Sequence, residues 1–241
     1  FSRILALLYH RKKLNSLLLT LTFSDGRPGS MTIASVTYVN AAAFKRPQDW
    51  VRFIRPYFGI FEQLTGQHSV HCFEQINYKG EYTEGGIQYH FLNFRTRINR
   101  LPLQLHKAVK KVKPDVVFVR GLHFPFQVMM LRRALGKQVK IIAQYHAGRP
   151  FRGIKKIMQR MADKRIDRYL FADTSMAMEW MDQRIITDRA KICETGMLSS
   201  VFTPMDKEKA RAVTGALGSP VFLWVGALNA NKDPLTVVKS F

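Results

Sequence analysis

Residues 113–119, with the sequence KPDVVFV, decide the fold class of this chain. A proline and an aspartate lead into four consecutive apolar residues, three of which are valines. A short, unbroken apolar run of this kind is typical of a strand that is buried on both faces of a parallel sheet. The sequence therefore predicts a central strand at 116–119.

Strands and helices are expected to alternate after this strand. Helices of about 10–15 residues separate the short apolar runs, which is the pattern of βαβ units. The expected strands are 139–143, 169–172 and 190–193, and the expected helices are 126–135, 151–165 and, after a cap at 173–175, a helix to Arg184. This order predicts an α/β fold with a doubly wound, mostly parallel sheet, in which ligands bind beyond the carboxyl ends of the strands.

The remaining elements follow from β-branched runs and helical spacing. Before residue 113, the expected strands are 33–39, 69–73 and 87–92, with a glycine-rich turn at 78–86 and helices at 49–64 and 101–112. Pro56 is expected to kink the first of these helices. Near the end of the chain we expect a strand at 221–226, a turn at 229–233 and a helix that starts at Pro234.

Residues 1–30 differ in composition from the rest of the chain. Residues 1–9 and 14–23 are largely apolar and flank three basic residues at 11–13. The longest uncharged run in this segment is too short to span a bilayer. Met31 is expected to be the natural start, with 1–30 an upstream or extension segment that is poorly ordered or helical. The alternative is a basic anchor on a membrane surface.

The composition excludes several classes of protein. Apolar residues make up 46% and charged residues 23%, which are globular proportions and not those of a collagen-like or mostly disordered chain. Cys72 and Cys193 provide neither a disulfide framework nor a zinc-ligand spacing. No GxGxxG motif supports a dinucleotide oxidoreductase. The formal net charge of +21 indicates an anionic partner: nucleic acid, an anionic membrane or a phosphorylated substrate.

The first candidate site follows the expected strand 139–143. His146 is succeeded by Ala147, Gly148 and Arg149, so a histidine and small residues lie at the carboxyl edge of the sheet. An imidazole there can hydrogen-bond sugar hydroxyls or a phosphate, and a small residue permits close approach. The alternative is a loop histidine that is satisfied by the backbone.

The second candidate site is the loop at 226–234. Gly226 ends the expected strand, Asp233 is expected to cap the next helix, and Pro234 suits the first helical position. A helix start of this kind favours anions, and Lys232 adds a positive charge. By spacing alone, many strand-to-helix loops look like this one.

A basic stretch at 149–168 is the third candidate. Its apolar residues fall on one helical face, and its basic residues lie elsewhere. The apolar residues are Ile154, Ile157, Met158 and Met161, and the cations proposed to face an acceptor or a membrane are Arg149, Arg152, Lys155 and Lys156. Two interpretations stay open: a solvated face on a helix packed into the core, or a surface that binds an anionic membrane or substrate.

His68, His71 and Cys72 suggest a metal site only at first sight. In a strand, residues 68 and 72 point to one face and residue 71 to the other. Because a metal needs converging ligands, no metal site is expected.

Four segments, taken in order, resemble motifs of the family-4 (group 1) glycosyltransferases, which have the GT-B fold. Residues 113–121 are similar to the family's "PDVVH" strand, and the strand that ends in His146 resembles its "HG" loop. Residues 194–204 look like the segment that crosses to the second domain. Residues 222–228, followed by Lys232, resemble the start of the donor domain, "VGRL" with a later lysine, and this is the most specific of the four.

The resemblance covers about residues 31–241 and implies a fold and a reaction. It implies a Rossmann-like, acceptor-binding domain at 31–200, then a crossover and the truncated start of a Rossmann-like donor-binding domain at 201–241. The reaction would be a retaining transfer of sugar from a nucleotide-sugar donor to a glycan or lipid-linked acceptor, in glycan, polysaccharide or glycolipid synthesis. The protein would be cytoplasmic or peripheral at a membrane.

The resemblance also implies roles for single residues. His146 would lie near the transferred sugar as the catalytic residue. Lys232 would bind the donor diphosphate, and Gly226 would let it approach. No metal and no cofactor are implied beyond the donor substrate.

The sequence departs from the family at three places. Ala227 stands where the family has an arginine, which removes one cation from the donor-phosphate site. The glycine pair expected after the first strand is replaced by residues 40–44, NAAAF. The family's "E-x7-E" element would fall beyond Phe241. The chain as given is therefore expected to be inactive. The alternative is a non-catalytic basic module that binds anionic membrane or nucleic acid by charge, without a recognised nucleic-acid motif.

Overall fold

The computed structural model describes residues 29–93, 102–145, 148–194, 205–226, 228–230 and 232–240. The chain divides into two compact units, Phe1–Ser200 and Val201–Phe241, which are described separately. The expected upstream segment, apart from its last two residues, lies outside the described residues.

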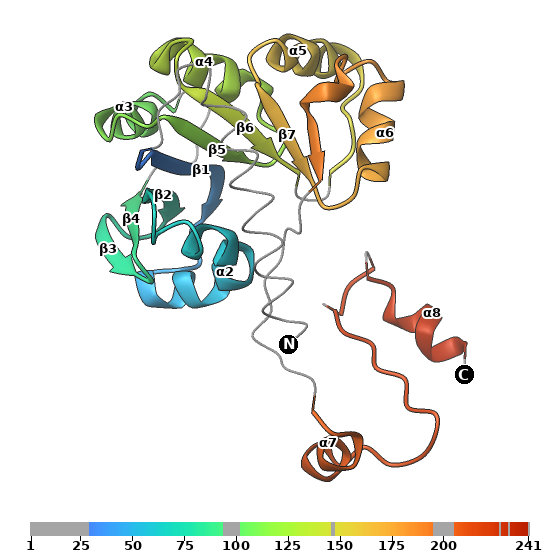
Figure 1. Ribbon diagram of the computed structural model, residues 1–241. Coiled ribbons are helices and arrows are strands. Elements are labelled where there is room, and N and C mark those ends of the chain that lie inside the picture. Colours follow the sequence, from blue (N-terminus) through green and yellow to red (C-terminus); the bar gives the residue numbers. More distant parts are fainter. Residues whose placement is uncertain are drawn as a thin grey trace. The chain divides into compact units, whose positions relative to one another are not determined.

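An eight-stranded sheet forms the centre of the first unit (Figure 1). Its strand order is β3-β4-β2-β1-β5-β6-β7-β8, and all neighbouring strands are parallel except β3 and β4. The strands are β1 (Thr32–Ala41), β2 (Ser69–Ile76), β3 (Gly80–Glu84), β4 (Ile87–Leu92), β5 (Val116–Arg120), β6 (Lys140–Gln144), β7 (Arg168–Phe171) and β8 (Ile192–Glu194). The predicted α/β fold with a mostly parallel sheet is confirmed.

The expected turn at 78–86 contains a strand instead. β3 pairs antiparallel with β4 at the edge of the sheet, and Glu84 lies opposite Ile87. Only Gly85 and Gly86 make the turn, with φ angles of +62° and +78°, which is the left-handed backbone that a two-residue hairpin turn of type I′ requires at both positions. The prediction treated the surrounding glycines as one long turn and was wrong for Gly80–Glu84.

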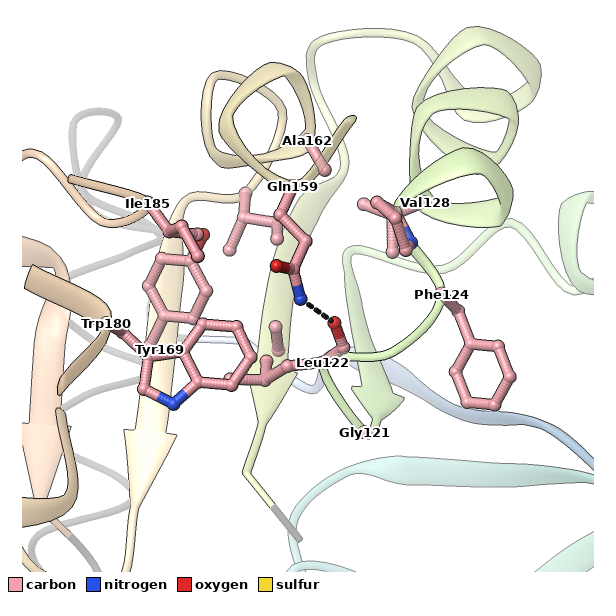
Figure 2. Close-up of a pocket in the computed structure, with 12 residues that line it drawn as sticks. Gly121, Leu122, Phe124, Val128, Gln159, Ala162, Tyr169, Trp180 and Ile185 are labelled. Carbon is pink, nitrogen blue, oxygen red and sulfur yellow. Dashed lines mark hydrogen bonds between the residues drawn. The ribbon is translucent and has the colours of Figure 1, made fainter. Parts of the chain in front are cut away.

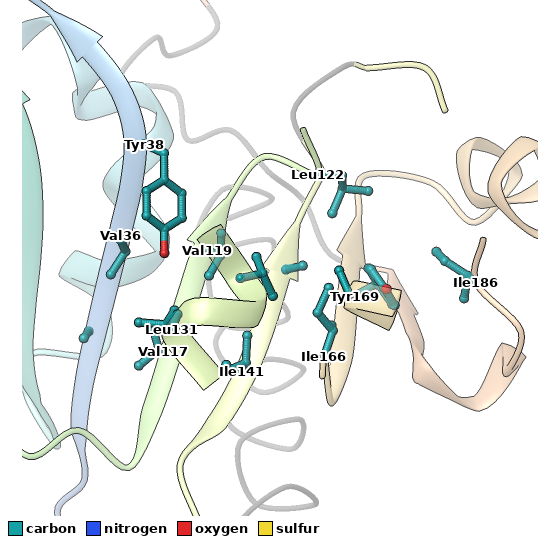
Figure 3. Close-up of a cluster of buried hydrophobic side chains, with 14 of the residues drawn as sticks. Val36, Tyr38, Val117, Val119, Leu122, Leu131, Ile141, Ile166, Tyr169 and Ile186 are labelled. Atoms are coloured by element: carbon teal, nitrogen blue, oxygen red, sulfur yellow. The ribbon is translucent and has the colours of Figure 1, made fainter. Parts of the chain in front are cut away.

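Helices cover both faces of the sheet, as a doubly wound fold requires (Figure 1). In the first unit they are α2 (Pro47–Glu62), α3 (Leu103–Lys111), α4 (Pro125–Leu135), α5 (Gly153–Asp163) and α6 (Ser175–Asp182). α2 packs on one face against apolar residues such as Ile33, Phe118 and Ile142. The other four contribute to the second core cluster, which includes Val117, Val119 and Ile141 (Figure 3).

Two short helices are described in the second unit, α7 (Lys207–Thr214) and α8 (Pro234–Lys239). Asp206 caps α7 by accepting hydrogen bonds from the N–H groups of Glu208 and Lys209, and Gly215 ends it in the left-handed conformation. The strand expected at 221–226 is not formed. Its side chains are largely exposed, with Leu223 at 86%. An apolar run becomes a strand only when another strand pairs with it, and none of the described residues of this unit does so.

No helix within the described ranges has both the length and the apolar character that crossing a membrane would require.

Candidate functional site

The order of the strands reverses direction beside β1. β1 pairs with β2 on one side and with β5 on the other, so the chain winds outward in both directions from this pair. In open α/β sheets the crevice outside the carboxyl ends of two such strands is the usual place for a ligand. The ends of β1 and β5 are therefore the first place to look for functional groups.

A row of polar side chains crosses the sheet at this edge. Thr37 of β1 is the register partner of Arg120 of β5, and Arg120 is the partner of Gln144 of β6. Side chains alternate along a strand, and Phe118 and Ile142 belong to the core on the α2 side. Arg120 and Gln144 therefore point to that same face, where an otherwise apolar layer becomes polar.

Arg120 forms a buried ion pair with Glu74 of β2. The Glu74 side chain is fully buried, and its carboxylate also accepts a hydrogen bond of 3.0 Å from Trp50 Nε1. The Arg120 guanidinium lies 4.7 Å from the centre of the Phe58 ring, within cation–π range. A buried carboxylate requires such partners, because burial without them costs several kcal/mol.

Part of the hydrogen-bonding capacity of this row is unused. Arg120 Nε and both polar atoms of the Gln144 amide are buried and have no hydrogen-bond partner within the part of the chain that is described. Buried polar groups normally have partners, so such exceptions call for an explanation. Chemically, the guanidinium and the amide can donate to the hydroxyl or phosphate oxygens of a ligand, and the amide oxygen can accept from a hydroxyl.

The loops after β5 and β6 meet above the same edge. A Cβ placed on Gly148 would overlap the His123 ring, so the imidazole lies directly against the glycine backbone. His123 also contacts Phe151, with ring centroids 5.4 Å apart. The half-buried imidazole of His123 therefore lies at the carboxyl edge, next to Gly148 of the first predicted site.

A small cavity lies nearby, on the other face of the sheet (Figure 2). Gly121, Val128, Tyr169 and Trp180 contribute to its largely apolar lining, and Gln159 Nε2 donates to the Leu122 carbonyl oxygen at 3.3 Å. Its volume of about 20 Å³ is room for roughly one water molecule. The cavity is therefore a packing defect and too small for a sugar.

His146 and Ala147, at the centre of the first predicted site, lie outside the described residues. Of the cations expected to face an acceptor or membrane, Arg149, Arg152 and Lys155 are exposed and Lys156 is half-buried.

The second predicted site lies in the second unit. Gly226 follows irregular backbone, so the expectation that it ends a strand is wrong. Lys232 is exposed in the turn before α8, where its N–H donates to the Asn229 carbonyl oxygen at 3.1 Å. Asp233 caps α8 by accepting from the Thr236 N–H at 3.3 Å, as predicted. Ala227 lies outside the described residues.

The residues of the suspected metal motif lie in separate surroundings. His68 Nδ1 accepts from the Met31 N–H at 3.2 Å, whereas His71 Nδ1 lies 3.0 Å from His90 Nε2. Cys72 is buried, which raises the pKa of its thiol. Among residues with a described position, no group of three or more His, Cys, Asp or Glu side chains could hold a metal ion.

Four residues of this edge were missed by the sequence analysis: Glu74, Arg120, His123 and Gln144. A signal existed for Arg120, because a charged residue ends an otherwise apolar strand. Nothing in the sequence pairs it with Glu74, which lies 46 positions away.

The chain matches no protein-family model, and no curated protein sequence is similar to it. Among solved structures, it is similar to the apo form of the lipopolysaccharide outer core galactosyltransferase WaaB, with 17% sequence identity and a TM-score of 0.43. The match covers 73% of this chain and 46% of the WaaB chain, so the 241 residues span less than half the length of that protein.

Proposed function

We propose that this chain is the acceptor-binding part, with the beginning of the donor-binding part, of a glycosyltransferase that uses a nucleotide-sugar donor. The observation that carries the proposal is the position of residues 113–121. This segment resembles a family-4 glycosyltransferase motif. It contains β5 and ends at Gly121, at the carboxyl edge of the sheet, and β5 pairs with β1, where the strand order reverses. Arg120 and Gln144 at this edge have spare hydrogen-bonding groups suited to sugar hydroxyls.

The roles of the two units follow the resemblance. The first unit would bind a glycan or lipid-linked acceptor, with His146 beside the transferred sugar. In the second, Lys232 would contact the donor diphosphate as the bond to the sugar breaks, and Gly226 would leave room for it. Catalysis would consist mainly of positioning and stabilisation of the leaving diphosphate. We propose a retaining outcome and no need for a metal.

Because the donor part would be represented only by its start, the 241 residues alone are proposed to bind acceptor and not to catalyse transfer. The basic composition supports a second candidate, a non-catalytic module that binds nucleic acid or membrane by charge alone. The two candidates predict different results with an uncharged saccharide. An acceptor-binding domain would bind it, whereas a module that binds by charge alone would have no affinity for it.

Saccharide binding is the test of this function. The chain is titrated with a panel of uncharged oligosaccharides and glycolipid headgroups, and binding is followed by saturation-transfer NMR in low and high salt. We expect saturable binding that salt does not weaken. His123→Ala should weaken it roughly five- to tenfold by removing a hydrogen-bonding group. His68→Ala, a second histidine beyond the amino end of β2, is the matched control and should bind like the wild type.

Absence of saccharide binding, together with salt-sensitive binding of RNA, would favour the basic module instead. The donor role is tested separately, in a version of the protein that includes a complete second domain. There, Lys232→Ala should weaken nucleotide-sugar binding and leave acceptor binding unchanged. An unchanged donor affinity would contradict the diphosphate role.

A further inference from the structure

Helix α5 is turned with its apolar side to the solvent. Its buried residues are Gln159, Ala162 and Asp163. Three of the four apolar residues that share a face at helical spacing are exposed instead, Ile154 at 75%, Ile157 at 56% and Met161 at 51%, and the fourth, Met158, is half-buried. The interpretation that this face packs into the core is therefore wrong. Water-exposed apolar side chains one turn apart are an unusual arrangement for a helix on a globular domain.

Polar anchors on the opposite side hold α5 in this orientation. Gln159 Oε1 accepts from the Phe151 N–H at 2.9 Å, while its Nε2 donates to the Leu122 carbonyl oxygen. Asp163 Oδ1 accepts from the Tyr169 hydroxyl at 3.0 Å and pairs with Lys191 Nζ at 3.1 Å. Turning the helix over would bury the apolar strip but would break these buried polar contacts, which is costly.

The apolar strip is surrounded by positive charge. Six exposed cations lie on or beside α5: Arg149, Arg152, Lys155, Arg160, Lys164 and Arg165. Arg160 and Lys164 follow Ile157 at intervals of three and seven residues and so lie along one border of the strip. The only acidic residue between 149 and 165 is Asp163, which is buried and paired. No exposed negative charge offsets the cations within this segment.

We infer that α5 is the helix by which this protein docks on an anionic lipid bilayer. The strip Ile154, Ile157 and Met161 would enter the boundary between headgroups and acyl chains, and the bordering cations would bind the lipid phosphates. The inference goes beyond the proposed transfer reaction and does not depend on it.

Charge and apolar character together favour this occupant over two others. A second copy of the chain would bring its own cations against these cations, which opposes association. A nucleic acid would satisfy the cations but would leave the apolar strip without a role, since phosphate contacts are made by charged groups. A bilayer with acidic headgroups satisfies both.

Vesicle co-sedimentation tests the inference. Wild-type chain is mixed with vesicles of pure phosphatidylcholine or of equimolar phosphatidylcholine and phosphatidylglycerol. The strip is removed in the triple variant Ile154→Ser, Ile157→Ser, Met161→Ser. The matched control is Val213→Ser, Leu217→Ser, Leu223→Ser, which replaces three exposed apolar residues of the second unit. Neither variant changes the net charge.

We expect preference for the anionic vesicles, an affinity reduced at least about tenfold in the strip variant, and no change in the control. In a separate Ile157→Trp variant, the tryptophan emission that exceeds that of the wild type, which has three tryptophans, should shift to shorter wavelength on anionic vesicles and stay unchanged with RNA. This second readout does not depend on the triple variant.

Three results would overturn the inference. The first is that the strip variant binds anionic vesicles as tightly as the wild type, which means adsorption by charge alone. The second is an indole emission that does not respond to vesicles. The third is a concentration-dependent dimer that the strip variant abolishes, which would assign the strip to a second copy of the chain.

Discussion

Gly148 allows the loop after β6 to lie directly against the imidazole of His123. The ring atoms occupy the space in which any larger residue would place its Cβ. The sequence marked this glycine as a small residue that lets a ligand approach. In the structure, the small size of this glycine allows a contact between two loops at the carboxyl edge instead.

Gly148→Ala should therefore destabilise the first unit by about 1–3 kcal/mol, because the added methyl group overpacks this contact. Urea unfolding followed by circular dichroism measures the change. Gly66→Ala is the control: nothing lies within 4 Å of its added Cβ, so its stability should change little. The double variant His123→Ala, Gly148→Ala should recover most of the loss. If it does not, the imidazole is not the clashing group.

At the scale of elements, α2 continues through a proline. Pro56 lies inside the helix Pro47–Glu62, where it cannot donate the backbone hydrogen bond of that position. The kink that the sequence predicts at this position stays a prediction, and the residues on both sides of Pro56 belong to one helix. Burial of Ile54, Phe58 and Phe61 against the sheet holds the helix together across this position.

Pro56→Ala should stabilise the first unit by about 1–3 kcal/mol, since it restores an N–H and removes the steric conflict of an interior proline. Thermal unfolding is the measurement. Pro47→Ala, at the first turn of the same helix, is the matched control and should bring no gain, because proline is well suited to that position. A loss of stability in Pro56→Ala would mean that the proline is required by its surroundings.

For the whole first unit, acid stability depends on a buried histidine of α3 that contacts the sheet. Burial lowers the pKa of His106 to about 4, and its Nε2 is hydrogen-bonded to the buried Tyr38 hydroxyl at 2.9 Å. The unfolded chain, with an ordinary histidine pKa of about 6.5, binds this proton more readily than the folded chain. Stability from this group is thus complete above about pH 6.5 and is lost as the pH falls toward 4.

The expected loss from His106 at pH 4 is about 3 kcal/mol relative to pH 7. It is measured by comparing the free energy of unfolding of wild type and His106→Gln across this range. The variant should lose about that much less on acidification. His68 and His71, whose pKa values are also lowered by burial, are present in both proteins and cancel in the comparison. Identical pH profiles would contradict the role of His106.

The sequence by itself determined the α/β class, the parallel strands of the first unit and, within a few residues, the positions of the described α-helices other than α7. Runs such as VVFV at 116–119 and helical spacing such as that around Ile54 and Phe58 are local signals, and burial of those apolar faces leaves one arrangement. The strand expected at 221–226 is not formed, and it shows the limit of such signals. A strand also needs a pairing partner, which the local sequence does not reveal.

Only the tertiary structure decided which polar groups meet at the carboxyl edge and which way α5 faces. Glu74 and Arg120 are far apart in sequence, and only the strand order β2-β1-β5 brings them together. The apolar spacing of α5 predicts a buried face, but the hydrogen bonds of Gln159 and Asp163 hold the opposite side against the domain. Contacts between distant segments determine both features, and a local pattern contains no information on distant partners.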